Sequence, residues 1–387
     1  MKRVNLILII ILSVLMAGCG GKKQSGNYDF ITVDVAKSFS SIKELFLQDF
    51  MDVEYIVLET KDDFINQGFV HDVGKEILLV SNRSNDGDIF VYDRKGKALR
   101  KINRKGQGSE EYSNITGITL DDDNNEMYVN NHFAKNILVY DLFGNFKRRL
   151  KQEEGQGLFY TDIFNYDKDN LICFSKTNQD GIFVIVSKKD GRITKKIKVP
   201  FSEKKLIQEN GGTEDSENPG FFRQTITYKG NWLLSEHSTD TTYLLLPDYS
   251  LLPFIVRTPS IHSMNPEIFL ILRFFSDRYY FMETFYNDYD YDSETSGFPV
   301  TCLMYDKKEK DFLGYNLYNG DYSTPRKIYM NFFRPVNHEI ESCLILKADQ
   351  LVESNKKGEL KGKLKEIAAN LNEESNPVIM LIKHRNK

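Results

Sequence analysis

The sequence predicts an all-β fold built from six four-stranded units arranged in a ring. Three observations lead to this prediction: the aromatic composition, a repeated hairpin and a regular spacing of apolar runs. The 387 residues include 27 Phe and 21 Tyr, which are residue types that favour strands. No helical periodicity occurs over residues 60–345, so strands are expected to form most of the chain.

The repeated hairpin consists of an apolar run, a Tyr-Asp pair, a turn containing Gly and a basic strand. Its clearest copies, DIFVYDRKGKALRKI from Asp88 and NILVYDLFGNFKRRL from Asn136, align without a gap. A third copy begins at Ile182, and weaker copies begin at Thr241 and Thr301. Two β-patterned runs around a short polar turn are typical of a β-hairpin.

Two further apolar runs precede each hairpin, which gives units of four strands. The nearer runs predict second strands that start near residues 76, 126, 170, 231, 278 and 341. The farther runs predict the first strands, from Gly68-FVHDV in the first unit to Ile328-YMNFF in the sixth. This spacing is typical of propeller blades, so we predict a six-bladed β-propeller. Two stacked sandwiches, the alternative, leave the repeat unexplained.

The sixth unit lacks two strands, and the ends of the chain can supply them. Val378-IMLIK is predicted to be its third strand and Val53-EYIVLET its fourth. This N-terminal strand would close the last blade, which removes an exposed sheet edge. Apolar residues at helical spacing, including Leu360 and Leu364, predict a short C-terminal helical insert over about residues 355–372, packed on a propeller face.

The N-terminus has the pattern of a bacterial lipoprotein signal. Lys2 and Arg3 precede an apolar stretch over residues 4–16, and Ala17-Gly18-Cys19 follows. The stretch is too short to span a bilayer. A cysteine after two small residues is what such a signal requires, because its thiol is alkylated with a diacylglyceryl group. An ordinary signal peptide with an incidental cysteine is the alternative.

These patterns divide the chain into three predicted segments. Residues 1–18 are a signal peptide, residues 19–50 are a lipidated N-terminus and tether with Cys19 as the lipidation site, and residues 51–387 are the propeller. With two or more acyl chains, the anchor would hold the protein stably on a membrane.

The charge and the cysteines of the chain each limit the possible functions. The net charge of −4 gives no basic face, so we expect no nucleic acid partner. The cysteines other than Cys19 lie in apolar runs: Cys173, Cys302 and Cys343. We expect three buried free thiols, with a Cys302–Cys343 disulfide as the alternative.

Three short segments carry a resemblance to a known family. They are YIVLET at Tyr55–Thr60, KGQGSEEY at Lys105–Tyr112 and NPVIMLIK at Asn376–Lys383. Together they resemble the opening strand, the first interblade loop and the closing strand of the six-bladed β-propeller lipoproteins of Bacteroidota, over about residues 30–385. The resemblance implies the propeller and export, and it implies no known reaction. Ser109 and Glu110 depart from the usual Pro-Gly of the loop.

The residues after Cys19 bear on location. Gly20-GKKQSGN contains no acid, whereas surface-exported lipoproteins of such bacteria usually carry acids there. We therefore expect a lipid anchor in the outer membrane, on its periplasmic face.

Ring geometry places the first strand of each blade beside the central channel, where polar residues are candidates for ligand binding. The channel-facing candidates are His71, Asp72, Asp162, Gln224, Arg273 and Arg334. Each such residue is more often structural than catalytic. The sequence contains no HExxH, HxH or GxSxG motif, so neither a zinc site nor a serine hydrolase is indicated, and no catalytic residue is predicted.

Two loops need separate treatment. Arg104–Tyr112 has glycines but no phosphate-loop pattern, so Glu111 is expected to accept backbone hydrogen bonds and Tyr112 to pack inward.

The second loop gathers four carboxylates: Asp288, Asp290, Asp292 and Glu294. Such oxygen-rich clusters suit Ca²⁺, but the EF-hand spacing is missing. We expect a solvated acidic tip and no cofactor, with a Ca²⁺ site as the alternative.

The sequence thus predicts a lipid-anchored, extracytoplasmic propeller that binds a ligand or protein of the cell envelope, such as a glycan or peptide. The alternative is a propeller hydrolase or lyase that acts on glycan or peptide at the channel. Convergent carboxylates or a metal at the channel mouth would favour the enzyme, and a plugged channel would favour the binding module.

Overall fold

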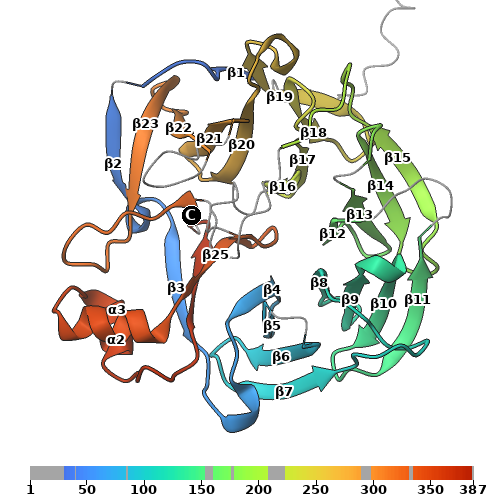
Figure 1. Ribbon diagram of the computed structural model, residues 1–387, viewed down its shortest axis with the longest axis vertical. Coiled ribbons are helices and arrows are strands. Elements are labelled where there is room, and N and C mark those ends of the chain that lie inside the picture. The colour runs from blue at the N-terminus through green and yellow to red at the C-terminus, as the bar shows by residue number, and fades with distance from the viewer. Residues whose placement is uncertain are drawn as a thin grey trace, which may run out of the picture. The chain divides into compact units, whose positions relative to one another are not determined.

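In the computed structural model, residues 30–385 are described except for residues 40, 84–85, 153–159, 176–177, 208–222, 289–297 and 331–333. The predicted signal peptide and Cys19 lie outside the described residues. Residues 1–30 and Ile31–Lys387 form two separate units. The second unit is a ring of six β-sheets around a central axis, which is the predicted six-bladed propeller (Figure 1).

Four blades follow one another from the first sheet, and each runs from its inner strand to its outer strand. The first contains β4 (Phe69–Val73), β5 (Ile77–Ser81), β6 (Asp88–Asp93) and β7 (Ala98–Asn103). The second contains β8 (Gly117–Asp121), β9 (Glu126–Asn131), β10 (Asn136–Asp141) and β11 (Phe146–Lys151). The third contains β12 (Asp162–Asn165), β13 (Asn170–Phe174), β14 (Ile182–Ser187) and β15 (Ile193–Lys198). The fourth contains β16 (Thr225–Tyr228), β17 (Asn231–Leu234), β18 (Thr241–Leu245) and β19 (Leu251–Thr258).

The last two blades complete the ring. The fifth contains β20 (Ile268–Phe275), β21 (Tyr279–Tyr286), β22 (Val300–Asp306) and β23 (Asp311–Tyr318). The sixth contains β24 (Arg334–Pro335), β25 (Ile340–Leu346), β26 (Val378–Lys383) and β3 (Asp52–Val57). The second strands therefore begin within one residue of the positions that the repeat predicts.

The predicted closure of the ring by the two chain ends is confirmed. β26 and β3 pair antiparallel, with Ile379 opposite Ile56. The buried Asn376 side chain ties the two ends further, because its amide donates to the carbonyls of Glu59 and Phe64 at 2.9 and 2.7 Å. A strand from each end of the chain therefore completes the sixth blade, with β3 as its outer strand.

The predicted first strand of the sixth blade at Ile328 is wrong. The inner strand is β24, which has only two residues. The apolar residues of the predicted strand pack elsewhere: Met330 is buried and Ile328 partly buried in the core cluster shared by the fifth and sixth blades. The backbone N–H of Ile328 donates to Leu317 at 2.7 Å, so this segment follows β23 instead.

The predicted boundary between tether and propeller also needs correction, because the ordered ring begins near residue 31 rather than 51. β1 (Ile31–Asp34) pairs parallel with β19, and β2 (Ile42–Phe46) pairs parallel with β23. Both are short strands that cover the outer edges of the fourth and fifth blades. Only one side chain in each strand is buried, so they lack the buried apolar runs by which the other strands are recognised.

The helical insert is present and starts earlier than predicted. It contains α2 (Ala348–Lys356) and α3 (Gly362–Ala368). Leu351, Leu360 and Leu364 pack with Tyr322 and residues of the outer strand β3. The insert therefore lies at the rim beside the sixth blade (Figure 1).

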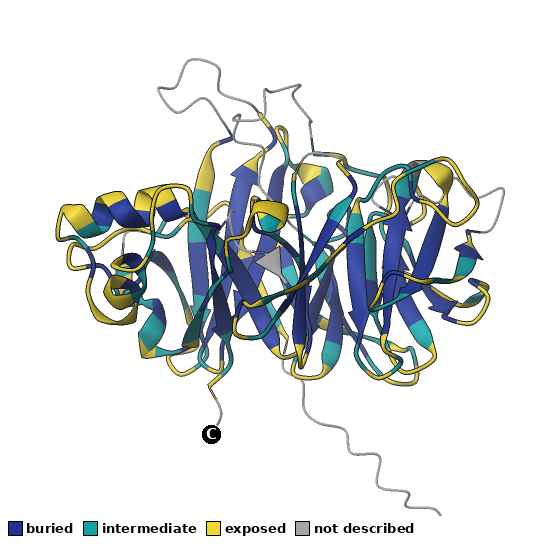
Figure 2. Cartoon of the chain, turned by 90° about the horizontal axis from the view of Figure 1, so that it is seen from below, coloured by how far each residue is buried: buried dark blue, intermediate teal, exposed yellow. Residues whose placement is uncertain are grey.

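The core lies between neighbouring blades rather than at one centre. Between the first and second blades, for example, Leu79 and Val91 pack with Leu120 and Val129, all at most 5% exposed. Figure 2 shows buried residues along the strands and exposed ones gathered where strands connect. Burying large apolar side chains in this way contributes about 1.5–3 kcal/mol each.

The connections distinguish two faces of the ring. We call the turn face the one where the first strand of a blade joins the second and the third joins the fourth, for example through Arg94–Lys97. The loop face carries the second-to-third connections and the links between blades, for example residues 104–116 and the helical insert. Short turns therefore occupy one face and the longer connections the other.

Candidate binding site in the central channel

The inner strands around the channel are tied together by bonds between blades. The hydroxyl of Thr119 on β8 donates to the carbonyl of Ile163 on β12 at 2.7 Å. The Asp72 carboxylate on β4 accepts from the backbone N–H of Leu120 at 2.9 Å, and Glu341 accepts from that of Phe275 at 2.8 Å. These bonds fix the inner ends of the blades relative to one another.

A loop of the sixth blade crosses the turn-face end of the channel. The Asn337 amide donates to the Asp72 carboxylate and to the Val73 carbonyl of the first blade, at 3.0 and 2.8 Å. Its own carbonyl accepts from Thr227 of the fourth blade at 3.2 Å. His338 packs edge-on against Trp232, also in the fourth blade, with ring centroids 4.8 Å apart. Because the fourth and sixth blades are not neighbours, this loop plugs the channel at the turn face.

Arg223, immediately before β16, extends to the centre of the ring. Its guanidinium lies 4.5 Å from the centroid of the Phe164 ring in the third blade. Desolvation lowers the pKa of this guanidinium, and the carboxylates of Asp162 in the third blade and Asp72 in the first oppose that shift. The Cys343 thiol of the sixth blade also opposes the lowering of this pKa. The Arg223 side chain comes from the fourth blade and interacts electrostatically with residues of the first, third and sixth blades. It therefore lies in the channel.

Arg223 has no hydrogen-bonded counter-ion among the described residues. Asp162 influences its pKa, but the two side chains are not within ion-pair distance. The Oδ2 atom of Asp162 is buried and has no hydrogen-bond partner. Buried polar atoms are normally paired, so a separated cation and anion, both incompletely bonded, suit a ligand that carries complementary groups.

Asp72 has a structural role at the same channel. Its carboxylate is buried and accepts from the backbone N–H groups of Leu120 and Val73 and from the Asn337 amide. Burial raises the pKa of Asp72, and these three hydrogen bonds oppose the rise. With its oxygens engaged, Asp72 links the first, second and sixth blades.

The other predicted channel residues make contacts within or beside their own blades. The His71 imidazole lies 2.8 Å from the Ser81 hydroxyl, and the Gln224 amide lies 3.1 Å from His237. Arg273 occupies a bulge in β20 and donates to Glu283 at 2.6 Å in a buried ion pair. Arg334 belongs to β24, and its side chain lies outside the described residues. A ligand-binding role for these residues stays a prediction.

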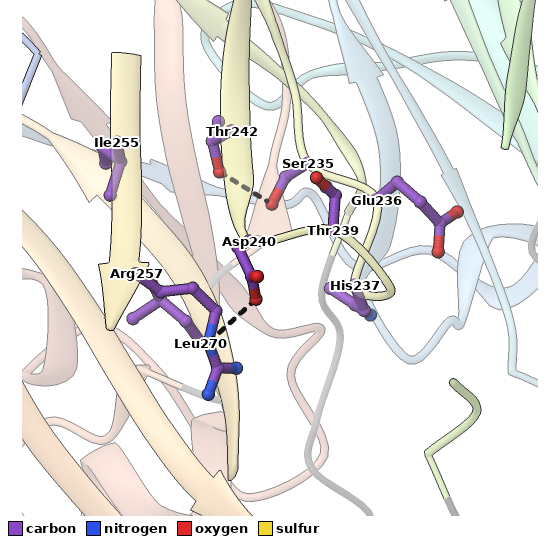
Figure 3. Close-up of a pocket in the computed structure, with 9 residues that line it drawn as sticks. All are labelled: Ser235, Glu236, His237, Thr239, Asp240, Thr242, Ile255, Arg257 and Leu270. Carbon is purple, nitrogen blue, oxygen red and sulfur yellow. Dashed lines mark hydrogen bonds and ion pairs between the residues drawn. The ribbon is translucent and has the colours of Figure 1, made fainter. Parts of the chain in front are cut away.

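A polar pocket lies between the fourth and fifth blades near the loop face (Figure 3). Its lining includes His237, Asp240 and Arg257, and its volume of about 20 Å³ has room for one or two water molecules. Burial lowers the pKa of Arg257 to about 10, and Asp240, 3.8 Å away, opposes that shift. Arg257 also donates to the carbonyls of Pro259 and Ile268. The charged groups of this pocket are therefore already paired with other groups of the protein.

The predicted loops and cysteines have the following outcomes. Glu111 accepts from the backbone N–H of Gly108 at 2.8 Å and Tyr112 is fully buried, which confirms the structural reading of that loop. Cys173, Cys302 and Cys343 form no disulfide, and Cys302 is only partly buried, so the alternative disulfide is wrong.

The acidic tip, with a Ca²⁺ site as its alternative, stays a prediction. Asp288 is solvent-exposed, and Asp290, Asp292 and Glu294 lie outside the described residues. Across the part of the chain that is described, no cluster of three His, Cys, Asp or Glu side chains suits a metal ion. Nor does that part contain a helix with the length and apolar character needed to cross a bilayer.

Residues 30–383 match the model of a protein family described as a domain of unknown function, DUF4934. The chain belongs to this family. The DUF4934 match spans the strands of all six blades, so the propeller as a whole is the family's domain. Arg223 and the plug at Asn337 both lie within the matched region.

One solved structure shares the fold, and two others match the chain more weakly. An exported protein described as putative, from Bacteroides fragilis NCTC 9343, is 15% identical, with a TM-score of 0.62, over 92% of this chain and 100% of that one. A member of the DUF4221 family from Bacteroides vulgatus ATCC 8482 is 12% identical, with a TM-score of 0.49, over 88% and 100%. A virginiamycin B lyase from Staphylococcus aureus is 7% identical, with a TM-score of 0.40, over 86% and 99%. No curated protein matches the chain.

Proposed function

We propose that this DUF4934 protein is a lipid-anchored binding module of the cell envelope, and that its channel holds an acidic group of a glycan or peptide. The observation that carries the proposal is Arg223, a guanidinium in the channel that lacks a hydrogen-bonded counter-ion among the described residues. A desolvated charge is costly unless it is paired, and an anionic ligand would supply the partner.

The plug supports binding over passage through the channel. Asn337 and His338 close the turn-face end through contacts with the first and fourth blades. A ligand would therefore enter from the loop face, where Arg223 and Asp162 stand at the starts of their inner strands. The unpartnered Oδ2 of Asp162 favours a ligand that also carries a hydroxyl or N–H donor.

The alternative hydrolase or lyase needs reactive groups that converge on a substrate. Asp72 is engaged by three hydrogen bonds, which leaves Asp162 as the one channel carboxylate with an unpartnered oxygen among the predicted site residues. A single carboxylate beside an arginine supports recognition more directly than general acid–base chemistry.

The anchor is proposed from the sequence. The Ala17-Gly18-Cys19 pattern supports lipidation at Cys19, and the acid-free residues after it support the periplasmic face of the outer membrane. The segments YIVLET, KGQGSEEY and NPVIMLIK support membership among the propeller lipoproteins of Bacteroidota, and the two ends of the chain, which carry the first and third, meet in the sixth blade.

A matched ligand panel tests the binding proposal. D-glucuronic acid and D-glucose differ at one carboxylate, and the dipeptide glycylglycine carries a carboxylate and N–H donors. We expect an acidic member of the panel to raise the melting temperature of the full-length protein by mass action, and glucose to leave it unchanged. Equal stabilisation by glucose and glucuronic acid, or no stabilisation by either acidic probe, would contradict the proposal.

A further inference from the structure

Gly117 is the first residue of the inner strand β8, and neither its conformation nor its packing requires a glycine. Its φ lies outside the left-handed region. A Cβ atom at this position would have no described atom of the chain within 4 Å, its neighbours in sequence aside. Glycine weakens a strand, and inside one it often marks a place where a ligand approaches the backbone. The space beside Gly117 is therefore open, at the loop-face end where β8 begins.

This open space faces the third blade. Side chains alternate along a strand, so a side chain at Gly117 would share its face with Thr119, which bonds to the Ile163 carbonyl of β12. Asn130 of β9 lies directly opposite Gly117 and points to the same side. The Asn130 amide donates to the carbonyl of Tyr160, just before β12, at 2.7 Å. The second and third blades thus border the space.

Three buried oxygens near this end of the channel lack a hydrogen-bond partner among the described residues. They are Oδ1 of Asn130, Oδ2 of Asp162 and Oγ1 of Thr225. Asn130 is 2% exposed and Thr225 is 1% exposed. Buried polar atoms are normally paired, so three such oxygens from the second, third and fourth blades point to a ligand that carries donors.

The strand pattern places Thr225 toward the channel. Thr225 begins the inner strand β16 and shares a face with Thr227. The Thr227 hydroxyl donates to the Asn337 carbonyl of the loop that plugs the channel. The intervening residue, Ile226, points the other way and packs in the core cluster shared with the fifth blade. The unpartnered Thr225 hydroxyl is therefore on the channel side of its strand, two residues after Arg223.

The same pattern places Asp162 toward Arg223. Asp162 begins β12 and shares a face with Phe164. The Arg223 guanidinium lies 4.5 Å from the centroid of the Phe164 ring. Asp162 and Thr225 thus begin neighbouring inner strands on either side of Arg223. One cation and several hydrogen-bond acceptors meet at this end of the channel.

These groups favour a sugar acid over an acidic peptide. The Asn130 and Asp162 oxygens can only accept, and the Thr225 hydroxyl can accept as well. Ring hydroxyls supply several donors at adjacent positions. Each peptide group brings a carbonyl with every N–H, and those carbonyls would need donors of their own.

We propose that the ligand is a sugar acid whose ring lies against Gly117, a proposal that rests on the proposed binding of an acidic group at Arg223. The carboxylate pairs with Arg223, and ring hydroxyls donate to Asn130, Asp162 and Thr225. Gly117 and Thr225 are then specificity-determining residues: Gly117 leaves room for the ring, and Thr225 recognises a hydroxyl.

Two acids of matched shape test the recognition of hydroxyls. Tetrahydropyran-2-carboxylic acid has the ring and the carboxylate of D-glucuronic acid but lacks the hydroxyls. In calorimetric titration of the full-length protein, we expect D-glucuronic acid to bind at least about tenfold more tightly. Thr225→Val should weaken the binding of D-glucuronic acid about threefold and leave that of the other acid unchanged. Thr32→Val, on the outer strand β1, is the matched control and should bind both acids like the parent.

Two variants test the open space. Gly117→Leu fills it, so we expect binding of D-glucuronic acid to weaken at least about tenfold. Gly117→Ala adds one methyl group and should bind more tightly than Gly117→Leu. Both variants should melt at or above the temperature of the parent, because a side chain here meets no described atom and reduces the freedom of the unfolded chain.

The possible failures are distinguishable. Equal affinity of the parent for the two matched acids, tighter binding of glycylglycine than of D-glucuronic acid, or a Gly117→Leu protein that binds D-glucuronic acid like the parent overturns the sugar acid alone. A parent that binds none of these acids overturns the acidic ligand at Arg223 and, with it, the sugar acid. If Gly117→Leu does not fold, the two matched acids and Thr225→Val still decide.

Discussion

Lys188 of the third blade forms a 2.6 Å ion pair with Asp121 at the end of β8 in the second blade. Both side chains are at most 5% exposed. The Lys188 ammonium also donates to the carbonyl of Asp167 at 2.6 Å, so its charge is well satisfied inside the protein. This pair joins two neighbouring blades near the turn face.

Removing one partner of this pair should be costly. We expect Lys188→Met to lower the free energy of unfolding by about 3–5 kcal/mol, because Asp121 would keep a buried, uncompensated charge. Adding Asp121→Asn should restore part of the loss. The matched control is Lys356→Met, whose pair with Glu373 is two-thirds exposed and should be worth at most about 1 kcal/mol. Equal losses for the two single variants in chemical denaturation would refute this account.

Glu126 should make the protein sensitive to acid. Burial raises its pKa, but hydrogen bonds from Arg148, Lys147 and Tyr128 outweigh that effect and lower the pKa to about 2. Because this folded-state pKa lies below the ordinary value of 4.5, the stabilisation is present above that value and is lost as the pH falls toward 2. We expect Glu126→Gln to flatten the dependence of unfolding free energy on pH between pH 5 and pH 3. Parallel curves for variant and parent would show that Glu126 contributes nothing.

The closure of the ring predicts that the C-terminal strand is indispensable. Removing residues 378–387 deletes β26 and leaves β25 and β3 with unpaired edges. We expect this truncation to abolish the single cooperative thermal transition or to make the protein aggregate. Removing only residues 386–387 is the control and should change nothing. A truncated protein that melts like the parent would count against closure by the two ends.

Lipidation at Cys19 predicts where the protein is found in fractionated cells. We expect Cys19→Ala to move it from the membrane fraction to the soluble fraction, because no acyl chain can then be attached. Cys302→Ala, at a partly buried free cysteine, is the matched control and should stay with the membranes. A Cys19→Ala protein that remains in the membrane fraction would rule out this anchor.

The fold could be predicted largely from the sequence because each copy of the repeated hairpin corresponds to one blade. The Tyr-Asp hairpins from Asp88 and Asn136 are β6–β7 and β10–β11. Strands without a long apolar run escaped prediction. β1 and β2 are short edge strands with one buried side chain each, and β24 has two residues. In the sixth blade, the apolar run at Ile328 fills a core between blades, which periodicity alone cannot distinguish from a strand.

The candidate site was predicted less well, because it depends on which side chains meet across the ring. The inner-strand rule found Asp72 and Asp162 but could not tell that three donors occupy Asp72. It placed Arg273 among channel residues, whereas that side chain pairs with Glu283. Arg223 was missed because it precedes its strand. A cation directly before an inner strand was the available signal, but only the three-dimensional arrangement shows its carboxylate neighbours.

Arg223 is the residue on which the proposed binding function depends most. Its substitution also separates a binding role from a structural one. Arg223→Gln removes a desolvated charge that lacks a hydrogen-bonded partner among the described residues. The melting temperature of the unliganded protein should therefore stay the same or rise. Arg223→Lys keeps the charge but loses the planar donor fork, so it should bind an acidic ligand with intermediate affinity.

The most direct test is a calorimetric titration of parent, Arg223→Gln and Arg223→Lys with D-glucuronic acid, or with glycylglycine if that is the acid that stabilises the parent. Arg100→Gln, on the outer rim, is the control. We expect Arg223→Gln to weaken binding at least tenfold, equivalent to about 1.4 kcal/mol, and Arg100→Gln to bind like the parent. An Arg223→Gln protein that binds the acid as tightly as the parent would contradict the proposed role of the channel.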